Sequence, residues 1–354
     1  IALCDWKLSF SENGIFDASL IYILNILTGN IECKGGILFP YSLPYSEFYN
    51  SIGMVEEKQE NFPSPYSLLE ILQKEKPEIL FLYYSNPIYK FPEQSLIEKE
   101  MSQIKLIVSF SPFFDETVEK IADLVLPDCT FLEREQDAPY IPYHTTRAIS
   151  FTKPVVSPIF DTMPTQDVII SLSKKILGEE NFRFNNFKEF VEGFISFLWE
   201  IKGGSPFTDP FEAKELERME KSGFWVRGYK NKQEFIKDVK EKGGWFDPVY
   251  ITGEYRRIFR TESGKFEFYS KIFENFLEKK DMDKILNKYK VQNLRELCFP
   301  RYIEREQEED GILLTLYSPL TFSYGTNANL PYLQEIMGYH LWIMWDSWCE
   351  IHPS

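Results

Sequence analysis

Residues 108–134, VSFSPFFDETVEKIADLVLPDCTFLER, place polar side chains where apolar segments end. Hydroxyl, amide, carboxylate and guanidinium groups are the ones with which proteins bind phosphates and polar ring edges. Another apolar segment precedes this stretch and begins at residue 78. The polar side chains at or just beyond the ends of all these segments are Asn86, Ser109, Ser111, Thr117, Glu133 and Arg134. The spacing predicts a polar ligand that lies across the tips of neighbouring strands.

A regular alternation of helices and strands would position these side chains. Residues 64–75, SPYSLLEILQKE, are typical of a helix with Ser64 as N-cap and Pro65 in the first turn. The chain then continues with a strand at 78–87, a helix at 91–101, a strand at 104–111, a helix at 114–121 and a strand at 122–127. Apolar strands that alternate with helices indicate a parallel sheet covered on both sides. Ligands of such α/β folds bind at the carboxyl ends of the strands.

The segments around this alternation are more varied. Residues 15–28 have helical spacing, 41–63 are typical of a surface loop, and 135–163 show no regular pattern. One helix follows with Asp167 in its first turn and Gly178 at its end, and another covers 186–204.

The last part of the chain mixes element types. Residues 205–310 combine charged helices with short strands at 245–251 and 265–270, and strand-like segments at 312–317 and 341–351 flank a polar loop. We therefore expect an α/β domain over 1–204, a mixed α/β segment over 205–310 and the start of a C-terminal β-barrel-type domain over 311–354.

Composition excludes several classes of function. The net charge of −15, from 54 acidic and 39 basic residues, would repel a phosphate backbone, so nucleic acid is not an expected partner. No apolar run reaches the roughly eighteen residues that a membrane-spanning helix needs. The five cysteines contain no CxxC pair and share no ligand spacing with the three histidines, so we expect no metal or iron–sulfur site within these residues.

From its two ends, we expect this chain to be an internal piece of a longer protein. It begins IALCDWKLSF, without an initiator Met or a signal-like segment, and ends WCEIHPS just after a strand-like stretch. A domain that stopped there would leave a strand edge unpaired.

Several landmarks together resemble one family. SNP, VSFSPFFDET and ADLVLPDCTFLER resemble the signature of the molybdopterin oxidoreductase family of the dimethyl-sulfoxide-reductase type. Further landmarks resemble that family in its own order: LNILTGNIECKGGILFP, PVVSPIFDTMPTQDVIISLSKKI, TESGKFEFYS, and NANLPYLQEI followed by WCEIHP.

The resemblance implies a large catalytic subunit that holds molybdenum or tungsten between two molybdopterin guanine dinucleotides. This cofactor shuttles two electrons while an oxygen or sulfur atom is transferred, and the protein positions and tunes it. The resemblance also places a [4Fe–4S] cluster and the metal-ligating residue in an N-terminal part outside these residues, so no cysteine here is assigned to either. It implies an iron–sulfur subunit and a membrane anchor subunit as partners, and a periplasmic or extracytoplasmic location.

The family resemblance implies that five residues of this chain contact the cofactor. The resemblance places Asn86 and Ser111 against one dinucleotide and Thr117 nearby. It assigns Arg134 to a phosphate and Asp167 to a guanine edge, whose two N–H donors a carboxylate can accept together.

Each of these residues also has a purely structural interpretation. Asn86 is also typical of a turn before proline, Ser111 of a helix cap, and Thr117 of a helix surface. An acid in a first helical turn, like Asp167, is favoured by the helix dipole alone. The candidate ion-pair partners for Arg134 are Glu133, Glu135 and Asp137.

A later loop and a tryptophan cluster complete the candidate residues. Ser318, Thr321, Ser323 and Thr326 supply the polar side chains of the loop between the last two strand-like segments. Trp342, Trp345 and Trp348 recur three residues apart, which favours core packing or subunit contact over a redox role.

Two functions are consistent with this pattern. VSFSPFFDET, GFWVRGY and GGWFDPVY are similar to the family branch with polysulfide, thiosulfate and tetrathionate reductase-like subunits and quinone-linked complexes. That favours a respiratory oxidoreductase acting on a sulfur compound with quinone-linked electron transfer. The alternative is a structural and electron-relay subunit, of the alternative complex III or menaquinone reductase type, which keeps the fold without the cofactor.

Overall fold

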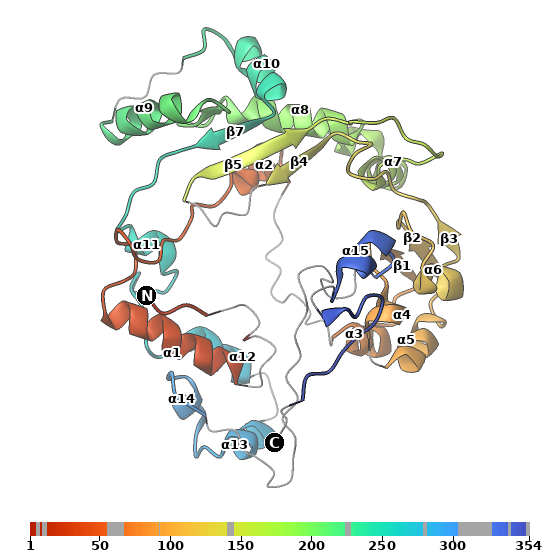
Figure 1. Cartoon of the computed structure of the whole chain (residues 1–354), viewed down its shortest axis with the longest axis vertical. Coiled ribbons are helices and arrows are strands. Elements are labelled where there is room, and N and C mark those ends of the chain that lie inside the picture. Colours follow the sequence, from red (N-terminus) through yellow and green to blue (C-terminus); the bar gives the residue numbers. More distant parts are fainter. Residues whose placement is uncertain are drawn as a thin grey trace.

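A computed structural model describes most of the chain. The described residues are 1–4, 8, 13–54, 67–91, 93–139, 145–223, 228–278, 282–303, 328–338 and 341–351. Figure 1 shows two separate sheets, each with its own helices, and a group of helices around α1.

The first sheet is parallel, as the alternation predicts. Its strands β1 (Ile79–Leu82), β2 (Leu106–Ser109) and β3 (Leu124–Val125) lie in the order β1-β2-β3. The connecting helices are α3 (Ser67–Glu75), α4 (Pro87–Lys90), α5 (Gln94–Met101) and α6 (Glu116–Ile121). All three strands lie inside the predicted segments but are shorter.

One face of this sheet is packed and the other is partly open. Leu82 and Ile107 form a core with Leu72 of α3 and Met101 of α5. The register aligns Phe81, Val108 and Leu124 on the opposite face. Phe81 is 43% and Leu124 45% exposed, so the described helices do not cover both faces as predicted.

The second sheet is antiparallel and was not predicted. It contains β4 (Gln136–Pro139), β5 (Arg147–Thr152), β6 (Ser205–Pro206) and β7 (Gly244–Asp247) in the order β4-β5-β7-β6. The expectation of an irregular stretch at 135–163 is therefore wrong at 136–139 and 147–152, where β4 and β5 lie. Because β5 pairs with β7, one sheet spans the predicted division at residue 204, although the domain division itself stays a prediction.

The core of the second sheet also draws on a predicted loop. Residues 45–51 form helix α2 (Tyr45–Ser51), and Phe48 is 1% exposed. It packs with Ile149 and Trp245 of the sheet and with Phe194 of helix α8 (Phe187–Leu198). The surface-loop expectation for 41–63 is thus wrong for its described part.

The remaining elements are mostly helical. α7 (Thr165–Leu177) is followed by a short 3₁₀ turn, η2 (Glu179–Asn181), and α9 (Pro210–Lys221) and α10 (Lys232–Lys242) lie beside the second sheet. The others are α1 (Gly14–Leu27), α11 (Tyr255–Ile258), α12 (Lys271–Glu278), α13 (Met282–Tyr289), α14 (Leu294–Leu297) and α15 (Pro331–Ile336). Phe16, Leu277 and Leu297 join α1, α12 and α14 in a third core.

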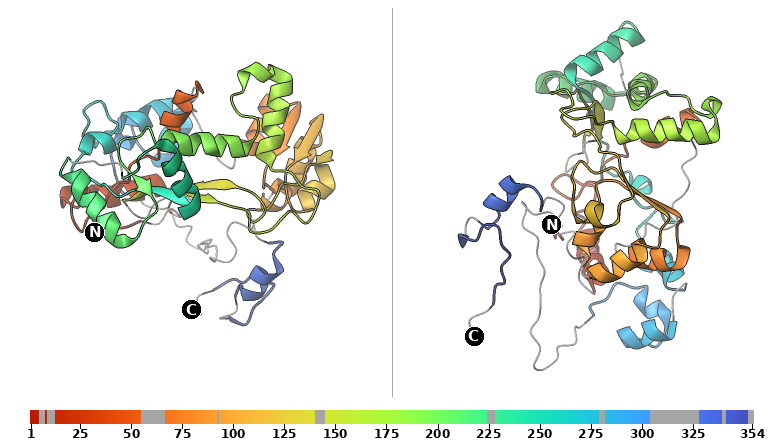
Figure 2. Two further views of the ribbon diagram at one scale, coloured as in Figure 1. Left: turned by 90° about the horizontal axis from the view of Figure 1, so that it is seen from above. Right: turned by 90° about the vertical axis from the view of Figure 1, so that its right-hand side faces the viewer.

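Several strand predictions for the later chain are wrong. Residues 265–270 and 341–351 contain no strand, whereas 312–317 lie outside the described residues. A C-terminal barrel is not found in the described residues after 311, which contain α15. Trp342 and Trp345 are 77% and 56% exposed, so core packing within this chain is wrong for both. Figure 2 shows this C-terminal segment projecting from the body.

The buried aromatic core predicts a selective loss of stability. Phe194 is 1% exposed and its ring lies 4.6 Å from that of Tyr45. Phe194→Ala should lower the free energy of unfolding by about 3–5 kcal/mol because it leaves a cavity. Phe211→Ala is the control, since Phe211 is 76% exposed. Equal losses of stability in denaturant titrations of both variants would contradict this packing.

Candidate functional site

The carboxyl ends of β1 and β2 form a common rim. The ladder continues one residue beyond β2, because the N–H of Phe110 donates to the carbonyl of Leu82 at 2.8 Å. After β1 the chain turns sharply at Tyr84, which has a φ of +47°, and α4 begins directly after Asn86. This turn brings the residues after β1 beside Ser111, as the parallel arrangement predicts.

Asn86 and Thr117 are joined by one direct hydrogen bond. The Thr117 hydroxyl donates to Asn86 Oδ1 at 2.6 Å and accepts from the N–H of Ile88 at 3.1 Å. Asn86 Oδ1 also accepts from the N–H of Tyr89, and Asn86 Nδ2 donates to Glu116 at 2.7 Å. Asn86 is thus the N-cap of α4. Thr117 is fully buried, so the helix-surface interpretation is wrong for it.

Ser111 has a local role in the turn after β2. Its hydroxyl accepts from the N–H of Phe113 at 3.1 Å, and Ser111 is 5% exposed. The cap of α6 is Asp115, whose side chain accepts from the N–H of Val118 at 3.0 Å. The helix-cap interpretation of Ser111 is therefore wrong.

A cavity of about 570 Å³ lies over this rim. Its walls include Tyr84, Ser85, Asn86, Ser111, Phe113 and, from α15, Gln334. The volume lies within the range of small-molecule and cofactor sites. Aromatic rings, hydroxyls and side-chain amides all line it, a combination that suits a planar, polar ligand.

Charged groups of both signs border the cavity. Lys90 lies on one wall and Asp115 and Glu116 on another. Burial raises the pKa of Asp115, and the Glu116 carboxylate raises it further. Burial, with a contribution from the Asp128 carboxylate, raises the pKa of Tyr84 to about 12, so Tyr84 keeps its proton at neutral pH. The carboxylates of the cavity wall can therefore accept hydrogen bonds from N–H groups of a ligand, and Lys90 can pair with one anionic group of that ligand.

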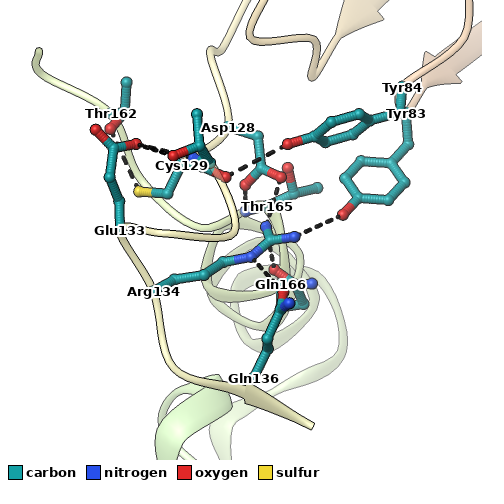
Figure 3. Close-up of polar contacts among 11 residues, drawn as sticks. Tyr83, Tyr84, Asp128, Cys129, Glu133, Arg134, Gln136, Thr162, Thr165 and Gln166 are labelled. Atoms are coloured by element: carbon teal, nitrogen blue, oxygen red, sulfur yellow. Dashed lines mark hydrogen bonds and ion pairs between the residues drawn. The ribbon is translucent and has the colours of Figure 1, made fainter. Parts of the chain in front are cut away.

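Arg134 lies outside the cavity in a buried polar cluster (Figure 3). Its Nη1 pairs with Asp128 Oδ2 at 2.5 Å, and both side chains are almost fully buried. Further bonds reach Gln136 at 3.0 Å, Tyr83 at 3.3 Å and Gln166 at 3.5 Å. Asp128 also accepts from the N–H of Thr165 at 2.8 Å. The partner of Arg134 is thus Asp128, not one of the three neighbouring acids.

Asp167 connects two helices. Its Oδ1 accepts from the N–H of Phe187 at 2.7 Å, so the carboxylate joins the first turn of α7 to the first residue of α8. Asp167 does not line the cavity at the rim.

The structure thus divides the predicted site residues. Asn86 and Ser111 line one cavity and Thr117 supports it from behind, whereas Arg134 and Asp167 lie elsewhere. Ser318, Thr321, Ser323 and Thr326 lie outside the described residues. The binding roles of these residues stay predictions.

Sequence reasoning missed Asp128 and Glu116. Asp128 follows Pro127 directly after the strand, a position of the same kind as the predicted ones, and this could have identified it.

The described residues lack two further features. They contain no group of three or more His, Cys, Asp or Glu side chains arranged to hold a metal ion. They also contain no helix with the length and apolar character needed to cross a bilayer.

The rim lies within a segment that matches a known family model. The model described as Molybdopterin oxidoreductase matches residues 5–175, which include β1, β2, β3 and the cavity wall from Tyr84 to Glu116. Residues 5–175 thus match a molybdopterin oxidoreductase domain.

Three curated members of the family are similar to the chain. The menaquinone reductase molybdopterin-binding-like subunit of Nitratidesulfovibrio vulgaris is 30% identical over 165 residues, covering 45% of this chain and 23% of that protein. The thiosulfate reductase molybdopterin-containing subunit PhsA of Salmonella typhimurium is 23% identical, covering 98% and 45%. The arsenate respiratory reductase molybdopterin-containing subunit ArrA of Shewanella sp. is 22% identical, covering 91% and 42%. The chain thus spans less than half the length of each relative.

A solved structure is also similar to part of this chain. Acetylene hydratase from Pelobacter acetylenicus matches 60% of this chain and 25% of its own, with 21% identity and a TM-score of 0.39.

Removal of one charge from the Asp128–Arg134 pair should have a large effect on the stability of the protein. Asp128→Asn should lower the free energy of unfolding by about 3 kcal/mol or more, since it leaves a buried guanidinium unpaired. Glu78→Gln is a matched control, because Glu78 and Lys105 are also 2.5 Å apart but both more than 70% exposed. That control should cost less than about 1 kcal/mol. Similar losses in chemical denaturation would contradict the burial of the pair.

Glu133 predicts a dependence of stability on pH. Its carboxylate accepts from the N–H groups of Thr130 at 2.8 Å and Ile159 at 3.2 Å, and these bonds lower its pKa. The stabilisation is therefore complete above the ordinary glutamate pKa of about 4.3 and is lost as the pH falls through the lowered value. Wild type should be more stable than Glu133→Gln at neutral pH, and thermal melts should converge in acid. A constant difference down to acid pH would contradict this role.

Proposed function

We propose that this chain is part of the large subunit of a molybdopterin-dependent oxidoreductase. The observation that carries the proposal is the cavity at the rim, where Asn86 and Ser111 lie together within the family segment. In this proposal the cavity holds one guanine dinucleotide arm of a bis-molybdopterin guanine dinucleotide with molybdenum or tungsten. An iron–sulfur cluster belongs to a part of the protein outside these residues.

The residues around the cavity fit a guanine nucleotide chemically. Glu116 can accept from the two N–H donors of a guanine edge, because a carboxylate has two acceptor oxygens. Tyr84 and Phe113 offer ring faces, and Lys90 can pair with a phosphate. When bound, the cofactor supplies two-electron transfer coupled to transfer of an oxygen or sulfur atom. The chain's own part is to orient the nucleotide and exclude water around it.

A sulfur compound is the proposed substrate, with electrons exchanged with quinone. Supporting observations are the similarities to a thiosulfate reductase subunit and to a menaquinone reductase subunit. An iron–sulfur subunit and a membrane anchor subunit are the proposed partners, on the periplasmic or extracytoplasmic face of the membrane.

A second function has specific support. The relative from Nitratidesulfovibrio vulgaris is named molybdopterin-binding-like, and its matched segment is 30% identical. In addition, Asn86 already bonds Thr117 and Glu116, and the carboxylates of Asp115 and Glu116 would oppose a phosphate. These observations favour a structural and electron-relay subunit that keeps the fold without the cofactor.

Cofactor content separates the two functions. The purified complex should contain molybdenum or tungsten by mass spectrometry and release guanine nucleotide and pterin on acid treatment. A complex without metal and pterin would overturn the first function and favour the second.

A cavity-filling variant then tests the location. Ser85 is exposed on the cavity wall, so Ser85→Trp should fill the cavity without unfolding the protein. Its guanine nucleotide content should fall by at least half. Ser102→Trp is the control, because Ser102 is exposed after α5 and outside the cavity. Full nucleotide content in Ser85→Trp would place the dinucleotide elsewhere.

A further inference from the structure

A second cavity, of about 950 Å³, lies far along the chain from the rim. Its walls come from α11, from the turn in the TESGK sequence and from residue 41. They include Tyr41, Tyr255, Arg256, Phe259, Lys265 and Phe266. The cavity at the rim shares none of these residues.

Two cations in this cavity have no carboxylate partner among the described residues. Neither Arg256 nor Lys265 makes an ion pair there, and both are exposed. Arg257 differs, because its guanidinium lies 3.4 Å from Glu254 and 3.8 Å from Glu32. Free cations on a concave wall stand out in a chain with a net charge of −15. They can pair with an anion from outside.

The backbone places these two cations together. Gly264 has a φ of +63°, and its N–H donates to the carbonyl of Thr261 at 3.0 Å, which closes a tight turn. A Cβ at Gly264 would lie 3.1 Å from Arg256 Cγ, so the arginine stem packs against the turn. Lys265 follows directly in sequence. Both positive groups therefore project from one short stretch of wall.

The neighbouring wall is held in place by Arg257. Its guanidinium lies 4.0 Å from the centre of the Tyr41 ring and donates to the carbonyls of Phe39 at 2.7 Å and Pro40 at 3.1 Å. The Tyr41 hydroxyl donates to Glu254. Burial and this carboxylate raise the pKa of Tyr41 to about 12, so the hydroxyl stays protonated at neutral pH. Arg257 is thus paired with Glu254 and Glu32, and the cations of this wall without an ion pair among the described residues are Arg256 and Lys265.

Aromatic rings cover the rest of the wall. The rings of Tyr255 and Phe259 are nearly parallel, with centroids 6.3 Å apart, and Phe266 meets Phe259 edge-on at 5.9 Å. Apolar surface around a cationic pair lowers the local dielectric and strengthens the attraction for an anion.

We propose that this cavity binds a small tetrahedral oxyanion, a phosphate or sulfur oxyanion group, through Arg256 and Lys265. Guanidinium matches such an anion with paired N–H donors, and the lysine ammonium adds a point charge. The proposal does not rest on the cofactor cavity.

Calorimetric titration of the full-length protein at low ionic strength tests this site. The probes are inorganic phosphate, sulfate and thiosulfate, each titrated separately. Arg256→Gln with Lys265→Gln should weaken binding by at least about tenfold, because charge-assisted hydrogen bonds are lost. Affinity should also fall as salt is added, since the pair is exposed. Tighter binding of phosphate would assign a phosphorylated ligand, and tighter binding of a sulfate or thiosulfate a sulfur oxyanion.

Two controls separate this site from general charge effects and from misfolding. Arg260→Gln removes an exposed arginine of the same segment that does not line the cavity, and it should leave binding unchanged. Arg256→Lys keeps the charge but lacks the paired N–H donors, so it should weaken binding less than the double variant does. Absence of binding in wild type, or equal weakening by Arg260→Gln, would overturn the proposal.

Discussion

The buried ion pair of Asp128 and Arg134 holds the two halves of the site region together. Asp128 follows the last parallel strand and also bonds the first residue of α7. Arg134 reaches back to Tyr83 after β1 and forward to Gln136 in β4. Four segments therefore meet at one charged contact, and the antiparallel sheet begins directly after it. A buried pair of this kind adds little net stability, but the loss of either partner leaves an uncompensated charge. Its main effect here is to fix one arrangement of the segments.

The rim cavity depends on a different kind of contact. Its wall after β1 is fixed by neutral hydrogen bonds of the Thr117 hydroxyl, which donates to Asn86 and accepts from the N–H of Ile88. Polar groups that sequence alone assigns to a ligand are therefore already bonded within the chain. A residue can therefore shape a binding site from behind it. Thr117 does so here, whereas Asn86, Ser111 and Glu116 lie on the wall itself. Whether a residue can contact a ligand or only supports the wall depends on which of its polar atoms are not already hydrogen-bonded within the chain.

The sequence predicts the local parts of this structure better than its long-range parts. The parallel unit follows from apolar segments and helices that alternate within fifty residues, and the rim follows from it. The antiparallel sheet could not be predicted the same way, because β4 contains Gln136 and Pro139, and because β5 pairs with β7 about a hundred residues later in the sequence. The burial of Phe48 could not be predicted either, because its segment is rich in tyrosine, serine and proline, a composition that indicates a loop. The contact of Asp128 with Arg134 depends on a turn that no local pattern specifies.

The pairing of β5 with β7 has a consequence for biosynthesis. Arg147 and Asp247 face each other in register and form an ion pair, although 100 positions separate them. Pairings between remote segments form slowly because a long loop must close first. On the ribosome, β5 can pair with β4 as soon as both strands have emerged. Its other edge can pair only after residues 244–247 of β7 have left the exit tunnel.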